Sequence, residues 1–456
     1  MIDSGPSWPS GTTPFSEKRR ARGLWTYGFL IIAAIGILLR VAVTIAAGNA
    51  PRTPWGGGGD TPGYILLAQN LIAGKGYTYA GMPTAYRPPF YPAFLAVCVR
   101  AFHGRALEAA RWIQLFAGLG AAFLCAAAAG RLCDSAAKKA ALVVVLFFPT
   151  LVDMSGEILT ETLAALCTAL LLYLLVRYIQ QPRWSVLIGM SVTVGVAALI
   201  RFNMALFGFV ILWVVLTTTS ASGLPRWRAA ALAIFLPVLI VSPWLIRNLI
   251  VFDGSLIFTT ESGPAAAMGI LAPEGRALPG DSERLRAALG WLPPMEIETN
   301  DERRDLLPSE SVLNRDAWRV SIHLWKVNGW KLVPLTIEKL GYFWLSTDQL
   351  LSTSALAFKV RIARAAGVVG YWILLALGIA GWFELRKRHR EFAAVVALYA
   401  ILITILHLPF NMNTRLRTPF MDPWIAVLAG IGLIQLRTWI GSTGLKLAGD
   451  PPEAAN

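Results

Sequence analysis

Residues 55–92 combine one early acid, one late base and many aromatic side chains in a polar stretch rich in glycine and proline. Four glycines precede Asp60, and Pro62 suits the first turn of a helix that would begin there. Residues 63–73 carry apolar side chains at helical spacing, which predicts an amphipathic helix lying against a membrane. Arg87 precedes two prolines, so we expect an extended, stiff chain around it. The stretch therefore predicts a structured loop with a carboxylate near its start.

The carboxylate of Asp60 has two interpretations. As the N-cap of the helix it needs only a side-chain oxygen. As a general base it needs to be ionised and within hydrogen-bond reach of an acceptor hydroxyl or amine. A flexible glycine run followed by a helix start is a good mount for a base, which favours the second interpretation.

A second group of acids lies in the segment SGEILTETL, residues 155–163. Glu157 and Glu161 are four positions apart, so we expect them to share one helix face at the start of an apolar span. The helix dipole favours acids at this end and explains part of the pattern. Glu161 lies about one turn deeper, where a carboxylate is costly, so we expect a catalytic role for at least one of the two. Asp153 is a weaker candidate.

Four arginines border apolar segments: Arg201 in LIRFN, Arg247 in SPWLIRN, and Arg415 and Arg417 in NTRLRTPF. A guanidinium binds phosphate oxygens through two parallel hydrogen bonds, so these side chains suit the phosphate of a lipid. The alternative is that each one extends to the lipid headgroups for solvation alone.

The composition identifies an all-α polytopic membrane protein. Apolar residues make up 55% of the 456 residues, and several apolar runs reach the roughly 20 residues needed to cross a bilayer. The net charge of +14 comes mostly from short loops, where Lys and Arg orient helices, so it does not indicate nucleic-acid binding. The four cysteines and four histidines show no metal-ligand spacing, and we interpret the cysteines as small apolar side chains.

Ten crossings are expected by length, at about 24–48, 106–130, 138–152, 157–177, 184–199, 202–218, 229–249, 365–384, 391–409 and 419–438. Residues 88–103 are expected to form a membrane-embedded or juxtamembrane helix. If crossings alternate from a cytoplasmic N-terminus, the cytoplasmic connections are basic, which agrees with the positive-inside bias: 131–139, 177–184, 224–228 and 385–391. The acids and arginines described above then all lie on the extracytoplasmic side of the plasma (inner) membrane.

The organisation that follows has five parts, with the first extracytoplasmic loop at 49–105 inside the second part. They are a disordered basic cytoplasmic tail (1–23), a transmembrane catalytic domain (24–250), an extracytoplasmic helical insert with juxtamembrane helices (251–362), the C-terminal transmembrane helices (363–438) and a cytoplasmic tail (439–456). Within the insert, 282–292, 315–330 and 332–350 are expected to be helical.

Five motifs give the chain a resemblance to the GT-C class of membrane glycosyltransferases. In chain order they are GGDTPGYILLAQNLIAGKGY, YRPPFYPAFLA, SGEILTETLAAL, PWLIRNLIVFDGSLIFTTESG and RLRTPFMDPWIAVLAGIGL. The likeness is to the bacterial branch related to dolichyl-phosphate-mannose–protein mannosyltransferases (glycosyltransferase family 39) and lipid A aminoarabinose transferase. LIRFN also resembles the short arginine loop of that branch.

The resemblance implies inverting transfer of a hexose or pentose from a polyprenyl-phosphate donor to an extracytoplasmic glycan, lipid or protein. It implies that Asp60 is the catalytic carboxylate and that Glu157 or Glu161 assists. The residues it assigns to the donor phosphate are Arg87, Arg201, Arg247 and Arg415, and the further candidate substrate contacts are Tyr64, Tyr86 and Asn248. Thr61 stands where protein mannosyltransferases have the second acid of an Asp-Glu pair, which argues against protein O-mannosylation.

The cofactor and the function class each leave an alternative open. Some members of the class use a divalent metal, but the sequence offers no dedicated ligand set for one. The alternative function is a transporter or flippase of a lipid-linked glycan or phospholipid, which predicts internal repeats with paired broken helices, and neither is found in the sequence. A non-catalytic scaffold would not explain the acids and arginines clustered on one side.

Overall fold

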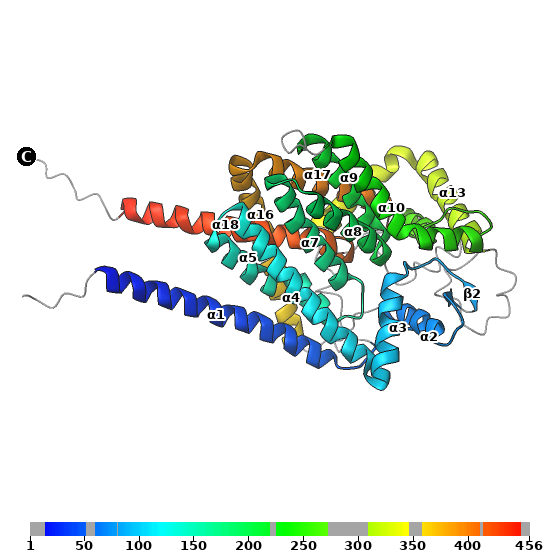
Figure 1. The fold of residues 1–456 in the computed structure, drawn as a ribbon, viewed down its shortest axis with the longest axis horizontal. Helices are drawn as coiled ribbons and strands as arrows, with labels where there is room; N and C mark the ends of the chain where they lie inside the picture. The colour runs from blue at the N-terminus through cyan, green and yellow to red at the C-terminus, as the bar shows by residue number, and fades with distance from the viewer. Residues whose placement is uncertain are drawn as a thin grey trace, which may run out of the picture.

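Long apolar sequences form helices here because a helix satisfies its own backbone hydrogen bonds, which lipid cannot do. The computed structural model describes residues 14–51, 60–79, 81–218, 225–271, 309–345, 358–410 and 414–447. These residues form a bundle of long helices, with the shorter helices of the first loop gathered at one end (Figure 1).

The elements up to the middle of the chain are α1 (Pro14–Ala47), α2 (Thr61–Ile72), β1 (Thr78–Tyr79), β2 (Met82–Pro83), α3 (Phe90–Phe102), η1 (His103–Arg105), α4 (Ala106–Leu132), α5 (Ser135–Phe147), α6 (Pro149–Asp153), η2 (Met154–Gly156), α7 (Glu161–Gln180) and α8 (Trp184–Ile200). The later elements are η3 (Phe202–Leu206), α9 (Phe207–Thr218), α10 (Arg226–Val251), α11 (Ser262–Leu271), α13 (Glu310–Asn328), η7 (Gly329–Leu332), α14 (Val333–Leu345), α16 (Phe358–Arg388), α17 (Arg390–His407), η8 (Thr414–Leu416) and α18 (Thr418–Leu447). Strands β1 and β2 pair antiparallel in a short hairpin within the first loop.

Among the described residues, seven helices are long and apolar enough to cross a membrane, and up to eight if α5 and the bent segment after it count as one span. That pair is bent by 54°, at the point where Pro149 cannot donate a backbone hydrogen bond. Two of the ten expected crossings, at 184–199 and 202–218, are apolar helices shorter than the length criterion requires. The polytopic all-α class is confirmed.

Some boundaries differ from the sequence-based expectation. Helix α1 begins at Pro14, so the part of the expected disordered tail that the structure describes is helical. Its sequence EKRRAR consists of good helix formers, which extend the helix beyond the apolar span. Helix α18 likewise runs to Leu447, past the expected end of its span. The helix expected at 282–292 lies outside the described residues.

Helix α18 lies at the centre of the bundle, since 78% of its apolar window is buried. It approaches α16 through glycines: a Cβ on Gly381 would collide with the carbonyl oxygen of Leu428, and one on Gly432 with that of Leu377. Small residues allow this close approach between membrane helices, where packing rather than the hydrophobic effect drives association. Arg415 and Arg417 lie directly before α18, so the close packing of this helix helps to fix their position.

The two ends of the bundle differ. The start of α1 and the end of α18 extend from one end, while α2, β2 and α13 lie at the other (Figure 1). The first loop and the insert, which are separated in the sequence by helices α4 to α10, therefore meet at the end opposite to the start of α1 and the end of α18 (Figure 1).

Candidate active site

Three acids and three arginines alternate in one chain of ion pairs, in the order Glu261, Arg87, Asp60, Arg415, Glu161 and Arg201. The charges of these six side chains sum to zero. Sequence reasoning selected all of them except Glu261. We refer to this set as the ion-pair chain.

The first half of the ion-pair chain is centred on Arg87. Its Nη2 donates to Oδ1 of Asp60 at 2.8 Å, and its Nη1 donates to Oε1 of Glu261 at 2.6 Å. Asp60 occupies the N-cap position of α2, but its side chain makes no capping hydrogen bond, so the N-cap interpretation does not describe it. The rings of Tyr64 and Tyr86 lie 5.4 and 5.0 Å from the guanidinium carbon of Arg87, so two of the predicted substrate contacts flank this arginine.

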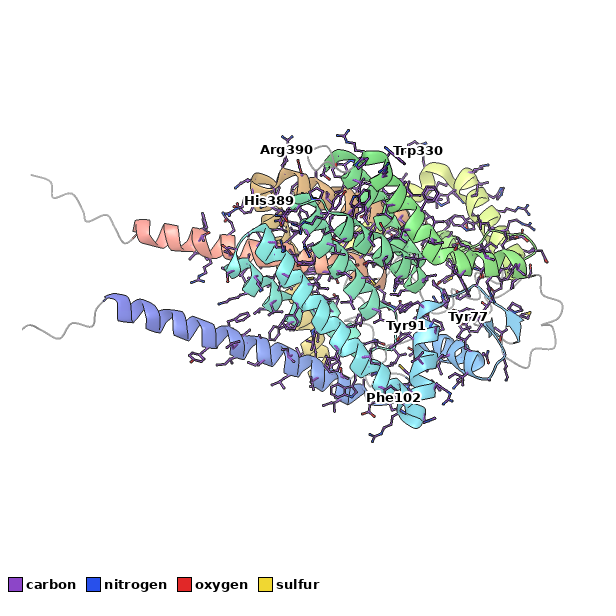
Figure 2. All side chains as sticks on the ribbon, viewed as in Figure 1. Tyr77, Tyr91, Phe102, Trp330, His389 and Arg390 are labelled. Carbon is purple, nitrogen blue, oxygen red and sulfur yellow. The ribbon has the colours of Figure 1, made fainter. Side chains whose placement is uncertain are left out.

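Aromatic side chains hold the first loop in place around Arg87. The Tyr77 hydroxyl donates to the Arg87 carbonyl oxygen at 2.8 Å. The Tyr64 ring packs edge-on against Tyr91, with 4.9 Å between the ring centroids, and the Tyr91 hydroxyl donates to Gln114 on α4. Tyr77 and Tyr91 lie at the end of the bundle where α2 and α3 are found (Figure 2).

Glu310, on α13, joins the segments that carry Arg87 and Glu261. Its Oε2 accepts from the Ala85 amide at 2.9 Å and from the Thr260 hydroxyl at 2.7 Å. Because the first donor lies two residues before Arg87 and the second lies next to Glu261, the insert takes part in placing this ion pair. Sequence reasoning missed Glu310, which has no distinguishing pattern around it. Glu261 is the acid of TTESG, at the end of one of the five motifs that resemble the GT-C class, so it could have been selected from the sequence.

The second half of the ion-pair chain is centred on Glu161, the first residue of α7. Its Oε1 accepts from Nε of Arg415 at 2.7 Å and pairs with Nη1 of Arg201 at 3.1 Å. Arg415 also reaches Oδ2 of Asp60 through Nη1 at 2.7 Å, so one guanidinium links the two acids. Arg201 also donates to the Thr160 hydroxyl at 3.1 Å. A helix N-terminus is a favourable place for the Glu161 charge.

The charges of the ion-pair chain change the titration of its members. Burial on its own would raise the pKa of Asp60, but the positive charges of Arg87 and Arg415 outweigh it, and the pKa lies below the usual range of an aspartate. Burial would lower the pKa of Arg87, and the charges of Asp60 and Glu261 raise it instead. Asp60 is therefore ionised at neutral pH, but it is a weak base while it is paired.

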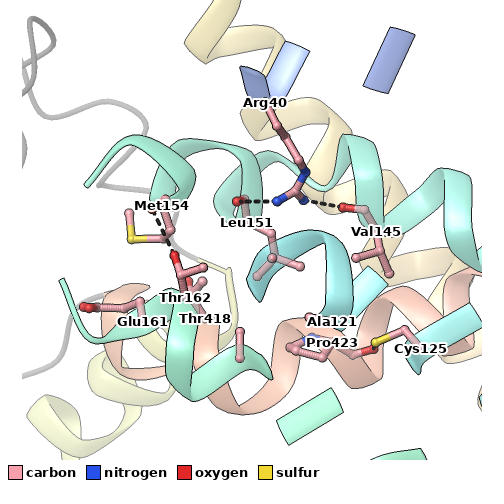
Figure 3. Close-up of a pocket in the computed structure, with 12 residues that line it drawn as sticks. Arg40, Ala121, Cys125, Val145, Leu151, Met154, Glu161, Thr162, Thr418 and Pro423 are labelled. Carbon is pink, nitrogen blue, oxygen red and sulfur yellow. Dashed lines mark hydrogen bonds between the residues drawn. The ribbon is translucent and has the colours of Figure 1, made fainter. Parts of the chain in front are cut away.

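Buried side chains fix the segment that leads into Glu161, because they donate to backbone carbonyl groups there and at the end of α5. The donors and acceptors are Arg40 to Val145, Leu146 and Leu151, Arg111 to Gly156, Gln114 to Glu157, Thr61 to Ile158, and Thr162 to Met154. Figure 3 shows Arg40 reaching the bend between α5 and α6. Helices α1, α2, α4 and α7 thus all contribute to the position of Glu161.

A cavity of about 20 Å³ lies between Arg40 and Glu161 and is also lined by Thr162 and Thr418 (Figure 3). This volume holds about one water molecule and is far below that of a substrate pocket. We therefore place the substrate-facing side of the ion-pair chain at Asp60, which is more exposed than Glu161.

The expectation that Glu157 and Glu161 share a helix face is wrong. Glu157 follows η2 in extended conformation, and α7 begins only at Glu161, because Pro149 breaks the preceding helix and a short 3₁₀ turn intervenes. Glu157 is buried, its carbonyl oxygen accepts from Gln114, and its charge acts on Arg111.

Two predicted substrate or phosphate residues lie beside the hairpin of the first loop. Arg247 donates to the carbonyl oxygens of Thr84 at 2.7 Å and Tyr77 at 3.0 Å. Asn248 accepts from Arg247 and donates to the Ile257 carbonyl oxygen at 2.9 Å. The structure does not bring them into the ion-pair chain; they tie the hairpin to the end of α10.

Arg417, two residues after Arg415, belongs to a different ion pair. Its Nε donates to Oδ1 of Asp422 at 3.0 Å, and both side chains are fully buried in the bundle. The Thr150 hydroxyl donates to the other oxygen of Asp422, which links α6 to α18. The sequence alone did not distinguish Arg417 from Arg415.

The described residues contain no group of three or more His, Cys, Asp or Glu side chains that could hold a metal ion. At the ion-pair chain itself, each acid is in contact with at least one arginine. These side chains do not fit a divalent metal, and no step below uses one.

A family model described as dolichyl-phosphate-mannose-protein mannosyltransferase matches residues 86–246. A search of the curated proteins gives no match. Among solved structures, the oligosaccharyltransferase of Archaeoglobus fulgidus in the apo form is similar, with a TM-score of 0.51 and 15% identity over 92% of this chain and 52% of that one.

The A. fulgidus oligosaccharyltransferase AglB in complex with an inhibitory peptide and a dolichol-phosphate gives a TM-score of 0.51 at 13% identity, over 95% of this chain and 53% of that one. ArnT from Cupriavidus metallidurans, bound to undecaprenyl phosphate, gives a TM-score of 0.38 at 15% identity, over 94% of this chain and 81% of that one. The chain thus spans about half the length of the oligosaccharyltransferase.

The fold is that of the GT-C class of membrane glycosyltransferases, and the resemblance found in the sequence is confirmed. The family match, to the mannosyltransferase description, includes Arg87, Glu161 and Arg201 of the ion-pair chain.

Proposed function

We propose that the protein transfers a monosaccharide from a polyprenyl-phosphate donor to an extracytoplasmic glycan, lipid or protein, with inversion at the anomeric carbon. The observation that carries the proposal is the contact between Asp60 and Arg415, at 2.7 Å. It puts a partly exposed carboxylate, suited to an acceptor, beside a guanidinium suited to a phosphate.

The comparisons support a lipid-phosphate donor. The matching family model is described by a dolichyl-phosphate sugar, and the AglB structure contains a dolichol-phosphate. Arg415 and Arg201 are the arginines we assign to the donor phosphate, because both are partly exposed and both rest on Glu161. Arg87 holds Asp60 from the other side.

The proposed reaction is a single displacement. Asp60 accepts the proton of the acceptor hydroxyl or amine as the acceptor atom attacks the anomeric carbon. The bond between that carbon and the phosphate oxygen breaks, and its electron pair leaves with the polyprenyl phosphate, whose added negative charge is stabilised by Arg415 and Arg201. Attack from the face opposite to the leaving group gives inversion.

Transport remains the alternative function to be separated by experiment. A transporter built from repeats has paired broken helices, whereas the described residues contain one bent pair, α5 with α6 and η2. A transporter also forms no glycosidic bond, so the purified protein would not join a monosaccharide to an acceptor.

The test is mass spectrometry of envelope glycans and lipids from a strain that lacks the protein, and from the same strain expressing wild type or Asp60→Asn. We expect one envelope component to lose one monosaccharide, and wild type but not the variant to restore it. An envelope unchanged by the deletion, or restored fully by Asp60→Asn, would contradict the proposal.

A further inference from the structure

Every arginine of the ion-pair chain already contacts a carboxylate. The charges of the set sum to zero, so an incoming phosphate gains a guanidinium charge of its own only by displacing one of the carboxylates. Which carboxylate leaves decides the state of the base during the reaction.

Burial separates the two acids that share Arg415. The Glu161 side chain is 1% exposed and the Asp60 side chain is 28% exposed. Glu161 also holds Arg201, and removing it would leave two partly exposed guanidinium groups without their common partner. Glu161 is thus the fixed support of the arginines.

Asp60 has the contacts of a group that can move. Its side chain makes no hydrogen bond to the helix that it precedes. Its two carboxylate oxygens are held by different arginines, Oδ1 by Arg87 and Oδ2 by Arg415. Loss of the second contact leaves the first in place, so Asp60 remains near the site when Arg415 is taken by another anion.

We propose that the donor phosphate replaces the Asp60 carboxylate on Arg415, while Glu161 keeps Arg415 and Arg201 in position, so that Asp60 is released to act on the acceptor only when the donor is bound. This inference rests on the proposed function and describes how binding of the donor would control the base. Releasing Asp60 from one of its two arginines removes a charge that lowers its basicity, so the carboxylate gains proton affinity at the moment the acceptor needs it.

The exchange closes a cycle in which protons and charges balance. The acceptor's proton goes to the freed oxygen of Asp60, and the electron pair of the broken bond goes to the phosphate on Arg415. When the polyprenyl phosphate leaves, Arg415 is again without a second anion. Asp60 then releases its proton to water and pairs with Arg415 once more, which restores the resting ion-pair chain.

The test compares substitutions that each remove one negative charge. Farnesyl phosphate is titrated into the purified full-length protein in phosphatidylcholine nanodiscs. Asp60→Asn should bind it about tenfold more tightly than wild type, because its competitor for Arg415 is gone. Glu161→Gln should bind it about tenfold more weakly, because the arginines lose their support. A general electrostatic effect would instead strengthen binding in both variants.

Two further variants control for charge and for folding. Glu261→Gln removes a charge that contacts Arg87 rather than Arg415, and it should bind within about threefold of wild type. Glu384→Gln neutralises an acid of the pair with Arg388, at the end of α16, and should not change binding. If Glu161→Gln lowers the melting temperature strongly, its binding result is set aside. The affinities of Asp60→Asn and Glu261→Gln for farnesyl phosphate then decide the test.

The outcomes separate the inference from the proposed function. Tighter binding by Asp60→Asn alone supports the exchange. Equal or weaker binding by Asp60→Asn, or equally tight binding by Glu261→Gln, overturns the exchange while the proposed transfer stands. If wild type does not bind farnesyl phosphate, the lipid-phosphate donor is wrong and the exchange falls with it.

Discussion

Nη1 of Arg415 lies 2.7 Å from Oδ2 of Asp60, although Asp60 directly precedes α2 and Arg415 lies just before α18. The contact joins two segments between which helices α2 to α17 lie in the sequence. It also connects Asp60 to Glu161 through one guanidinium, since Nε of Arg415 contacts Glu161 at 2.7 Å.

Asp60→Asn should reduce sugar transfer by about a hundredfold to ten-thousandfold, the usual cost of losing a general base. The fold should be kept, because the Asp60 side chain caps no helix. Asp60→Glu keeps the charge but moves it by a methylene, so a smaller loss is expected. The measurement is sugar transfer by the purified protein in nanodiscs, with the melting temperature as the control. Full transfer by Asp60→Asn would exclude Asp60 as the base.

Arg415 and Arg417 should respond differently to substitution, although they are two residues apart. Arg415→Lys should weaken donor binding about tenfold, or about 1.4 kcal/mol, with little change in stability, because only the forked geometry is lost. Arg417→Met leaves Asp422 buried without its partner and should cost about 3–5 kcal/mol of stability. Donor titration and thermal melting of both variants test this; the reverse pattern would contradict the assignment.

Glu310 should act through the segment that carries Arg87. Glu310→Ala leaves the Ala85 amide and the Thr260 hydroxyl without their acceptor, so melting temperature and transfer rate should both fall. Burial raises the pKa of Glu310, so the neutral Glu310→Gln, which keeps an acceptor oxygen, should retain most of both. If Glu310→Gln lowers the melting temperature and the transfer rate as much as Glu310→Ala does, the negative charge itself is required, and the hydrogen bonds alone do not explain the role of Glu310.

The membrane orientation can be tested by cysteine labelling in a background without the native cysteines. Lys75→Cys on the first loop and Arg315→Cys on α13 should react with an impermeant reagent from outside the cell. Ser135→Cys and Lys387→Cys, at the other end of the bundle, should react only after the membrane is opened. All four positions are exposed, so a reversed pattern would place the ion-pair chain on the cytoplasmic side.

Lys339 predicts a pH dependence of stability. Its amine is buried and donates to the Leu408 carbonyl oxygen at 3.0 Å. Burial lowers its pKa to about 8 from the usual lysine value of 10.5. Folding therefore releases a proton, and the contribution of Lys339 to stability rises between about pH 8 and pH 10.5.

The measurement for Lys339 is the melting temperature of wild type and Lys339→Met from pH 7 to pH 10. Other groups titrate in both proteins, so the difference between them isolates the amine. The melting temperature of Lys339→Met minus that of wild type should be largest near pH 7. This difference should shrink as the pH rises toward 10. Parallel curves would show that the amine stays charged in the folded protein.

The sequence by itself determined the class of the protein and most of its reactive residues. Apolar runs separated by basic loops can only be accommodated as membrane helices, because lipid offers no partner for an open backbone. Charged residues beside such runs are costly, so Asp60, Glu161, Arg201 and Arg415 could be selected by type and position alone.

Only the tertiary structure decided which of these charges pair. Helix length and register follow from nearest neighbours in the chain, whereas an ion pair depends on the packing of distant helices. The bend at Pro149 separates Glu157 from the helix that carries Glu161. The glycine contacts between α18 and α16 help to fix the position of Arg415, which lies just before α18. Arg415 and Arg417 look alike in sequence, yet Arg415 faces Asp60 at the end of the bundle and Arg417 faces Asp422 inside it. The reason is that side chains two positions apart in a helical turn point in different directions.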